Sequence, residues 1–142
     1  MIETESDLPG APKEISFYTN EAYYCNEPSR TRRHTVRLDG FVSAWAGLKG
    51  GEILTAPIRF DGGQLEANVS TSAAGLLRVQ ILDENARAID GFSFEDCDDF
   101  FGDTVAHTVT WKGSDDVSSL AGKPIRLCFA LSDADLYSYR FF

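Results

Sequence analysis

Two neighbouring stretches carry the clearest structural signal in this chain: QLEANVST at residues 64–71 and LLRVQIL at residues 76–82. Apolar and polar residues alternate in both stretches, and the apolar positions are Leu65, Ala67, Val69, Leu77, Val79 and Ile81. A period of two places those side chains on one face of an extended strand and the polar ones on the other. Each stretch therefore predicts a half-buried antiparallel strand.

Similar strand signals occur on both sides of these two stretches. They fall at residues 15–24, 31–42, 105–111, 125–131 and 136–142, with turn sequences such as DGG at 61–63 between them. No segment keeps a 3.6-residue apolar period over several turns. This pattern predicts an all-β fold, an antiparallel β-sandwich of jelly-roll type, with an open barrel as the alternative.

The first third of the chain predicts an N-terminal β-hairpin. Residues 15–24 and 31–42 are its strands, and residues 25–30, with Asn26 and Pro28, are its turn. The polar residues 1–13 predict a disordered leader, and residues 14–142 a single β-sandwich domain.

The charge of the chain excludes some partners. Twenty-two acidic residues against thirteen Lys and Arg give a net charge of −9. A nucleic-acid partner is not expected, because binding phosphates requires clustered positive charge. A membrane partner is not expected either, since no apolar run approaches the roughly 20 residues that a spanning helix needs. The compartment stays open, and would be extracellular or periplasmic if a parent chain is exported.

The densest acidic segment is GFSFEDCDDFFGDTVAHTVTW at residues 91–111. Its candidate ligand-binding carboxylates are Asp96, Asp98, Asp99 and Asp103. Three alternatives remain: a structural calcium site, a loop that contacts a ligand, and a solvated turn. Calcium requires six to eight oxygen ligands, and the spacing here is not that of an EF-hand loop. No cofactor other than calcium is suggested.

Aromatic residues supply two further binding candidates, Trp45 and Tyr137. Trp45 stands beside a Gly-rich turn and is expected to be exposed, whereas Trp111 shares parity with Val105 and Val109 and is expected in the core. Tyr137 is expected on one side of the last strand together with Tyr139 and Phe141.

Catalytic and zinc-binding motifs are missing from the sequence. It contains no GxSxG elbow, no glycine-rich phosphate loop and no closely spaced Cys and His ligands. A set of carboxylates on one loop does not provide the two opposed groups that glycoside hydrolysis needs. The domain is therefore expected to be non-catalytic. Cys25, Cys97 and Cys128 are compatible with buried thiols, one disulfide or a reactive thiol.

Four longer phrases of the chain are EISFYTNEAYY, RTRRHTVRLDGFVSAWAG, GGEILTAPIRFDGGQLEANVSTSAAGLLRVQILDENARAIDGFSFEDCDDFFGD and WKGSDDVSSLAGKPIRLCFALSDADLYSYRF. Together they resemble the C-terminal β-sandwich region of bacterial glycosyl-hydrolase-like proteins with a sialidase-like or family-32-like propeller upstream. The resemblance covers residues 14–142. It implies an accessory sandwich docked on a catalytic propeller or binding carbohydrate. It also implies a second interpretation of the hairpin, in which residues 14–43 belong to the junction with the upstream propeller. It assigns no catalytic residue to this chain.

Two functional hypotheses follow. The first is a non-catalytic, carbohydrate-associated module that binds a sugar through the candidates Trp45, Asp96, Asp98, Asp99, Asp103 and Tyr137. The second is a purely structural packing or assembly domain without a ligand. The aromatic and basic hairpin also predicts a homo-oligomer formed through residues 15–42, because an exposed strand pair invites association with another copy.

Overall fold

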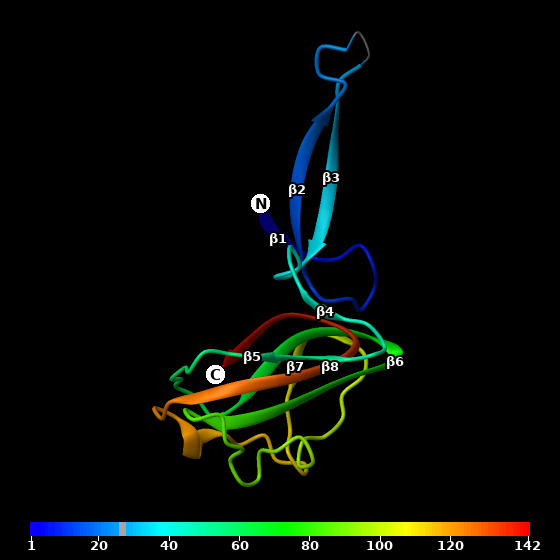
Figure 1. The fold of residues 1–142 in the computed structure, drawn as a ribbon. Helices are drawn as coiled ribbons and strands as arrows, with labels where there is room; N and C mark the ends of the chain where they lie inside the picture. The colour runs from blue at the N-terminus through cyan, green and yellow to red at the C-terminus, as the bar shows by residue number, and fades with distance from the viewer. Residues whose placement is uncertain (26–27) are drawn as a thin grey trace. The chain divides into compact units, whose positions relative to one another are not determined.

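The computed structural model describes residues 1–25 and 28–142, and shows an all-β protein (Figure 1). The chain divides into two compact units, Met1–Val42 and Ser43–Phe142. The single domain over residues 14–142, with the junction interpretation of residues 14–43 as its alternative, stays a prediction. Each unit contains one antiparallel sheet, with three strands in the first and five in the second. The all-β prediction is confirmed and the sheets are consistent with a sandwich, whereas the jelly-roll connectivity stays a prediction.

The first unit is built on the predicted hairpin. It contains β1 (Ile2–Thr4), β2 (Glu14–Glu21) and β3 (Arg30–Arg37), in the sheet order β1-β2-β3. β2 and β3 pair in continuous register, from Glu14 opposite Arg37 to Glu21 opposite Arg30. The hairpin prediction is therefore confirmed for its strands. The part of the predicted turn at residues 26 and 27 lies outside the described residues.

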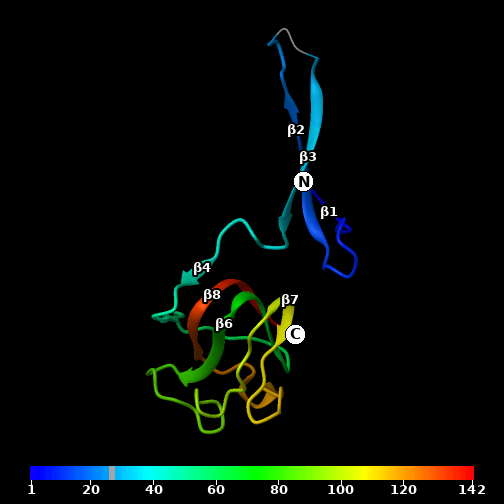
Figure 2. The same ribbon diagram turned by 90° about the vertical axis from the view of Figure 1, so that its right-hand side faces the viewer.

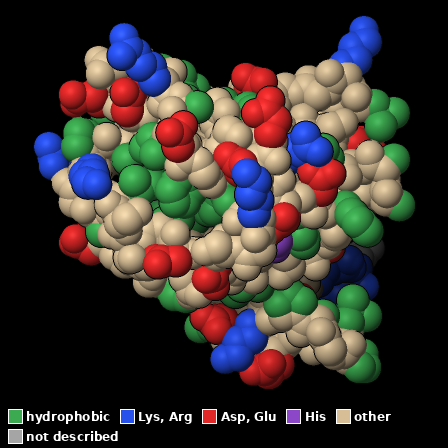
Figure 3. All heavy atoms as spheres, turned by 90° about the horizontal axis from the view of Figure 1, so that it is seen from below, with side chains coloured by type: hydrophobic (Ala, Val, Ile, Leu, Met, Phe, Trp, Pro, Cys, Tyr) green, Lys and Arg blue, Asp and Glu red, His purple; other side chains and the backbone are tan. Residues whose placement is uncertain are grey.

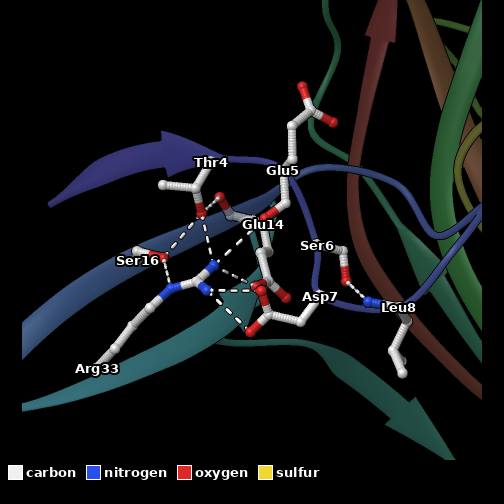
Figure 4. A network of polar contacts seen from close by, with 8 residues as sticks. All are labelled: Thr4, Glu5, Ser6, Asp7, Leu8, Glu14, Ser16 and Arg33. Carbon is white, nitrogen blue, oxygen red and sulfur yellow. Dashed lines mark hydrogen bonds and ion pairs between the residues drawn. The ribbon is translucent and has the colours of Figure 1, made fainter.

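The leader predicted to be disordered is held to this hairpin by Arg33 (Figure 4). The Arg33 guanidinium donates hydrogen bonds to Ser16 Oγ at 2.8 Å, Asp7 Oδ2 at 2.9 Å, Glu14 Oε1 at 2.9 Å and Thr4 Oγ1 at 3.1 Å. In addition, β1 pairs with β2. The segment that the sequence analysis expected to be a disordered leader thus contains the strand β1 at Ile2–Thr4, and an arginine fork on β3 binds several of its groups at once.

The second unit is built on two long strands that pair with each other. Its strands are β4 (Ala44–Ala46), β5 (Gly51–Leu54), β6 (Leu65–Asp83), β7 (Asp103–Thr108) and β8 (Ile125–Phe141). The sheet order is β4-β8-β6-β7, and β5 also pairs with β8. A short 3-10 helix, η1 (Ser118–Leu120), precedes β8. The predicted strands at 64–71 and 76–82 are thus the two halves of β6.

β6 and β8 curve together near their middle (Figures 1 and 2). The register passes from Thr71 opposite Ala134 to Leu76 opposite Ser132, so that residues 72–75 lie opposite Asp133 alone. Such an insertion bends a strand pair and increases its twist. Gly75 is required there, because a Cβ atom on it would lie 2.5 Å from the Asp133 carbonyl oxygen.

The core of the second unit follows the predicted alternation. Its fully buried side chains include Leu65, Leu77, Ile81, Leu127 and Phe129. Within the described residues, every buried hydrophobic side chain belongs to residue 46 or beyond. The hydrophobic core of the described structure is therefore a property of the second unit.

Candidate functional site

The connection between β6 and β7 contains most of the predicted acidic site, and its carboxylates bind groups of the protein itself. Asp96 forms an ion pair with Lys112 and accepts hydrogen bonds from the hydroxyl of Ser93 at 2.8 Å and its amide at 3.2 Å. These contacts, with Lys112 foremost, lower the pKa of Asp96. Asp96 therefore closes the turn over residues 93–96 by bonding back to Ser93, as the last residue of a capping box does.

Asp98 and Asp99 have similar local roles. Asp98 accepts hydrogen bonds from Thr110 Oγ1 at 2.6 Å and from the amide of Gly113 at 2.8 Å, and both lower its pKa. Asp99 pairs with Arg78 on β6, which lowers the pKa of that carboxyl. Each carboxylate therefore stabilises a turn or fastens the connection to the sheet.

The predicted calcium site is not assembled in the described part of the chain. There, no group of three or more His, Cys, Asp or Glu side chains is placed so that it could hold a metal ion. Asp96, Asp98 and Asp99 bind Lys112, Thr110 and Arg78 respectively, while Asp103 begins β7. On the face shown in Figure 3, acidic side chains likewise lie among basic and polar ones. Calcium binding thus has no geometric support.

The same connection covers the edge of β6 that β7 does not reach. Leu77 exchanges two backbone hydrogen bonds with Phe100. The Ile81 amide donates to the carbonyl of Phe92, and the Ile81 carbonyl accepts a bond from the amide of Ile89. Phe92 lies outside any named strand and Phe94 lies in a turn. An uncovered edge would expose a row of unpaired backbone groups. The acidic connection therefore acts as an irregular strand that completes the sheet.

The remaining predicted candidates lie on the main sheet, and two of them share one row. Trp45 on β4 lies directly opposite Asp135 on β8. Asp135 lies opposite Ser70 on β6, and Ser70 lies opposite Asp103 on β7. Directly opposed residues project from the same face of an antiparallel pair. The structure therefore places Trp45, Asp135, Ser70 and Asp103 in one line across four strands, here called the cross-strand row.

The row lies on the side of the sheet away from the core. Ala46 and Ala134, the neighbours of Trp45 and Asp135, are buried and oppose one another. Because successive side chains alternate, Trp45 and Asp135 face away from that core. The Trp45 side chain is 70% exposed. Its predicted exposure is confirmed.

Local contacts position both ends of the β4–β8 pair. Ser43 donates a hydrogen bond from its hydroxyl to Asp135 Oδ1 at 2.5 Å. Gly47 lies beside the Trp45 ring, since a Cβ atom at Gly47 would be 3.4 Å from the ring. The small residue leaves room for the indole to extend along β4, and the hydroxyl orients the neighbouring carboxylate.

Tyr137 lies two residues beyond Asp135 and is half-buried. The register with β6 passes from Val69 opposite Leu136 to Asn68 opposite Ser138, so Tyr137 occupies a β-bulge. Sequence reasoning missed Asp135 and Ser70 as members of the row. Ser70 is an outward position of the predicted strand at 64–71, whereas Asp135 lies between the predicted strands at 125–131 and 136–142, which the structure joins into the single strand β8. The alignment of both residues with Trp45 depends on the register.

The remaining reactive side chains are the three cysteines and His107. All three cysteines are free thiols, with Cys25 exposed and Cys97 and Cys128 buried. Burial raises the pKa of Cys97 and of Cys128. His107 stacks on Phe100 with a centroid separation of 3.8 Å, and burial lowers its pKa. In the described ranges there is no helix of the length and apolarity needed to span a membrane.

Comparisons of the chain with protein-family models, with curated proteins and with solved structures found no match.

Proposed function

We propose that the second unit is a non-catalytic accessory module that binds carbohydrate through the cross-strand row. The observation that carries this proposal is the exposed Trp45 indole in register with the Asp135 carboxylate. An exposed indole presents a large apolar face, and the polar groups beside it can fix the orientation of a ligand. Sugars combine an apolar C–H face with hydroxyl donors, so they match both features.

The chemistry of the row favours binding rather than bond cleavage. Asp135 and Asp103 both accept hydrogen bonds when ionised, and the Ser70 hydroxyl can donate or accept one. They lie in one line on one face of a sheet. Two carboxylates that cleave a glycoside must instead flank the scissile bond. The row therefore supports recognition of a sugar surface.

The proposed context is a larger carbohydrate-active protein. The resemblance of residues 14–142 to sandwiches that follow a sialidase-like or family-32-like propeller supports a catalytic propeller as the upstream partner. In that setting the jelly-roll connectivity and an exported, extracellular or periplasmic parent chain are parts of the same proposal. Catalysis would lie in the propeller, and this chain would contribute sugar contact and packing.

A glycan array probed with residues 1–142 tests this function. The expected result is binding to one group of related glycans and a loss of at least tenfold in Trp45→Ala. Tyr24→Ala is the matched control, because Tyr24 is also an exposed aromatic residue but belongs to the first unit. Failure to bind any glycan, or equal losses in the two variants, would contradict the proposal.

A second candidate function is a structural packing or assembly domain, which one observation on the first unit favours. Its described residues include no buried hydrophobic side chain, while Tyr18, Tyr23 and Tyr24 are exposed. Small sheets need an apolar face covered by another element to be stable. A homo-oligomer through residues 15–42 would supply such cover. Light scattering should then find an oligomer of residues 1–142. The double variant Tyr23→Ser/Tyr24→Ser should shift the protein towards monomer.

A further inference from the structure

We infer that a second copy of this chain pairs with β2 along residues 17–21, here called the distal β2 edge, around a two-fold axis at Thr19. The inference rests on the second candidate function, an assembly domain, and names the strand edge through which the copies meet. Three features of the first unit support it: the short extent of β1, the charges on the two edges of the sheet, and the length of the ladder that β2 can form with itself.

β1 covers only one end of β2. It pairs with β2 at three positions, and at the last of them Ile2 lies opposite Ser16. β3 pairs with the other side of β2 along its whole length (Figure 1). Among the described residues, no strand pairs with the distal β2 edge on the β1 side. A two-stranded hairpin is only marginally stable in water, and an open edge presents unpaired backbone groups. The distal part of the hairpin therefore lacks the third strand that a stable small sheet requires.

Charge distinguishes the two edges of this sheet. Arg30 and Arg32 on β3 share the carboxylate of Glu21, so that two guanidinium groups face one carboxylate. Two copies joined along β3 would bring such like charges together, and charged side chains on an edge oppose pairing. Residues 17–20 of β2 are instead Phe, Tyr, Thr and Asn, which are uncharged. The distal β2 edge is therefore the one that a second copy can approach without repulsion.

The geometry of β2 determines the register. A two-fold axis perpendicular to the sheet makes the interface self-complementary, and the residue on the axis lies opposite itself. An axis at Thr19 pairs residues 17–21 of one copy with residues 17–21 of the other. An axis shifted to either neighbouring residue gives a shorter ladder, because it meets the edge of Ser16, which β1 occupies, or reaches Ala22. Ala22 has a φ of 58°, so the chain leaves the strand there. Thr19 is therefore the centre that gives the longest ladder.

This register also brings exposed apolar side chains together at both ends of the ladder. Ala22 of one copy would come opposite Ser16 of the other, the position at which Ile2 already pairs. The hairpin tip with Tyr23 and Tyr24 would then lie close to Ile2 of the second copy. All three side chains are exposed in the single chain. Their contact removes apolar surface from water twice in each dimer.

Sedimentation of residues 1–142 from about 1 µM to about 1 mM tests the inference, since so short an interface is expected to be weak. The wild type should form a concentration-dependent dimer. Thr19→Lys puts two like charges opposite each other at the axis and should raise the dimer dissociation constant by about tenfold or more. Thr35→Lys is the matched control, because Thr35 is an exposed threonine on β3, and it should leave that constant unchanged. An equimolar mixture of Thr19→Lys and Thr19→Glu should restore the dimer, because opposite charges then meet.

Cysteine crosslinking tests the register. The variants carry Cys25→Ser, because Cys25 is the exposed one of the three cysteines. Thr19→Cys should form a disulfide-linked dimer on mild oxidation, since directly opposed residues lie within the Cα separation of a disulfide. Tyr18→Cys should not, because its two copies would be about 8 Å apart in the ladder. Tyr18→Cys mixed with Asn20→Cys should crosslink, because these two positions oppose one another.

The outcomes separate this inference from the function on which it rests. A wild type that remains monomeric at every concentration would overturn both. A dimer that persists in Thr19→Lys, or that does not crosslink through Thr19→Cys, would overturn the distal β2 edge and leave assembly through another surface intact. Equal loss of the dimer in Thr19→Lys and Thr35→Lys would also overturn that edge. Crosslinking decides the inference even where a lysine variant fails to fold, and carbohydrate binding by the second unit is independent of each result.

Discussion

The indole nitrogen of Trp111 donates a hydrogen bond to the carbonyl oxygen of Val79 at 2.9 Å, within the buried side of the second unit. The amide of Val79 in turn donates to Cys97 Sγ at 3.2 Å. Both backbone groups of a residue on the β6 edge are thus satisfied by side chains of the acidic connection and the segment after β7. This relationship shows why the acidic stretch is structural: it completes the sheet where β7 ends.

Trp111→Phe should destabilise the protein by about 1–3 kcal/mol, because it leaves the buried Val79 carbonyl without its donor while keeping an aromatic ring. Urea denaturation followed by circular dichroism measures the change. Trp45→Phe is the control, since Trp45 is exposed and should be nearly neutral. Equal stability of Trp111→Phe and the wild type would show that water replaces the lost bond.

The acidic connection should make stability fall in acid. Hydrogen bonds from Thr110 and Gly113 lower the pKa of Asp98 below its usual 3.8, and the pKa of Asp96 and of Asp99 are lowered as well. A carboxyl with a lowered folded-state pKa contributes stability above its unfolded pKa, and loses it as the pH falls through the folded value. Stability should therefore decline below about pH 3.8.

Asp98→Asn tests whether a carboxylate of the acidic connection causes the loss of stability in acid. The variant should be less stable than the wild type near neutral pH, and the difference should shrink as the pH falls through the acid range. Urea midpoints measured from pH 6 to pH 2 give both curves. Asp90→Asn is the control, because Asp90 is an exposed aspartate of the same connection. Its urea midpoint should change with pH as that of the wild type does. A constant difference between Asp98→Asn and wild type at all pH values would refute the assignment.

Calcium should not stabilise the protein through the acidic connection. Asp96, Asp98 and Asp99 are engaged with Lys112, Thr110 and Arg78, and a ligand that bound only the folded state would have to replace these contacts. The melting temperature should be the same in EDTA and in millimolar calcium. A rise with calcium that disappears in Asp98→Asn would contradict this prediction.

Gly75→Ala should destabilise the second unit by about 1–3 kcal/mol, in the range of overpacking substitutions. Its Cβ atom would lie 2.5 Å from the Asp133 carbonyl oxygen, a backbone atom that cannot move without disturbing the β6–β8 bend. Thermal denaturation measures the effect. Gly63→Ala serves as the comparison, since its nearest neighbour would be 3.9 Å away, and it should cost less.

Arg33→Lys should release the N-terminal segment from the hairpin while conserving the charge. A lysine cannot reproduce the guanidinium fork that binds Thr4, Asp7, Glu14 and Ser16 together. Hydrogen exchange at residues 2–7 should become faster. Arg30→Lys, at an exposed ion pair with Glu21, should leave that exchange unchanged. Equal protection in the two variants would show that β1 pairing alone holds the segment.

The alternation of apolar and polar residues was sufficient to predict which side chains are buried where a strand is regular. Leu65, Leu77 and Ile81 are buried as their parity predicts, and the β2–β3 hairpin forms where aromatic and β-branched residues favour strands. The same alternation predicted the wrong face for a side chain near the C-terminus. Tyr137 was expected to share a face with Tyr139 and Phe141, but the bulge at Tyr137 puts Leu136 and Tyr139 opposite the buried Val69 and Ala67.

The candidate site was only partly predictable for the same reason. Trp45 and Asp103 were identified as separate candidates, whereas Asp135 and Ser70 were not identified at all. Composition left the acidic connection open between a calcium site, a ligand-contact loop and a solvated turn, because its partners Arg78, Thr110 and Lys112 come from other parts of the chain. A charge pattern does not reveal whether a carboxylate faces a ligand or a neighbouring side chain.

The sequence by itself determined the all-β class, the hairpin and the inward face of the central strands, because these depend on residues two positions apart on one strand. Only the tertiary structure decided that residues 65–83 form one bent strand, that Arg33 fixes the N-terminal segment, and that Trp45 is aligned with Asp135. These depend on register between distant segments. A single bulge shifts that register by one residue and reverses which side chains face the core.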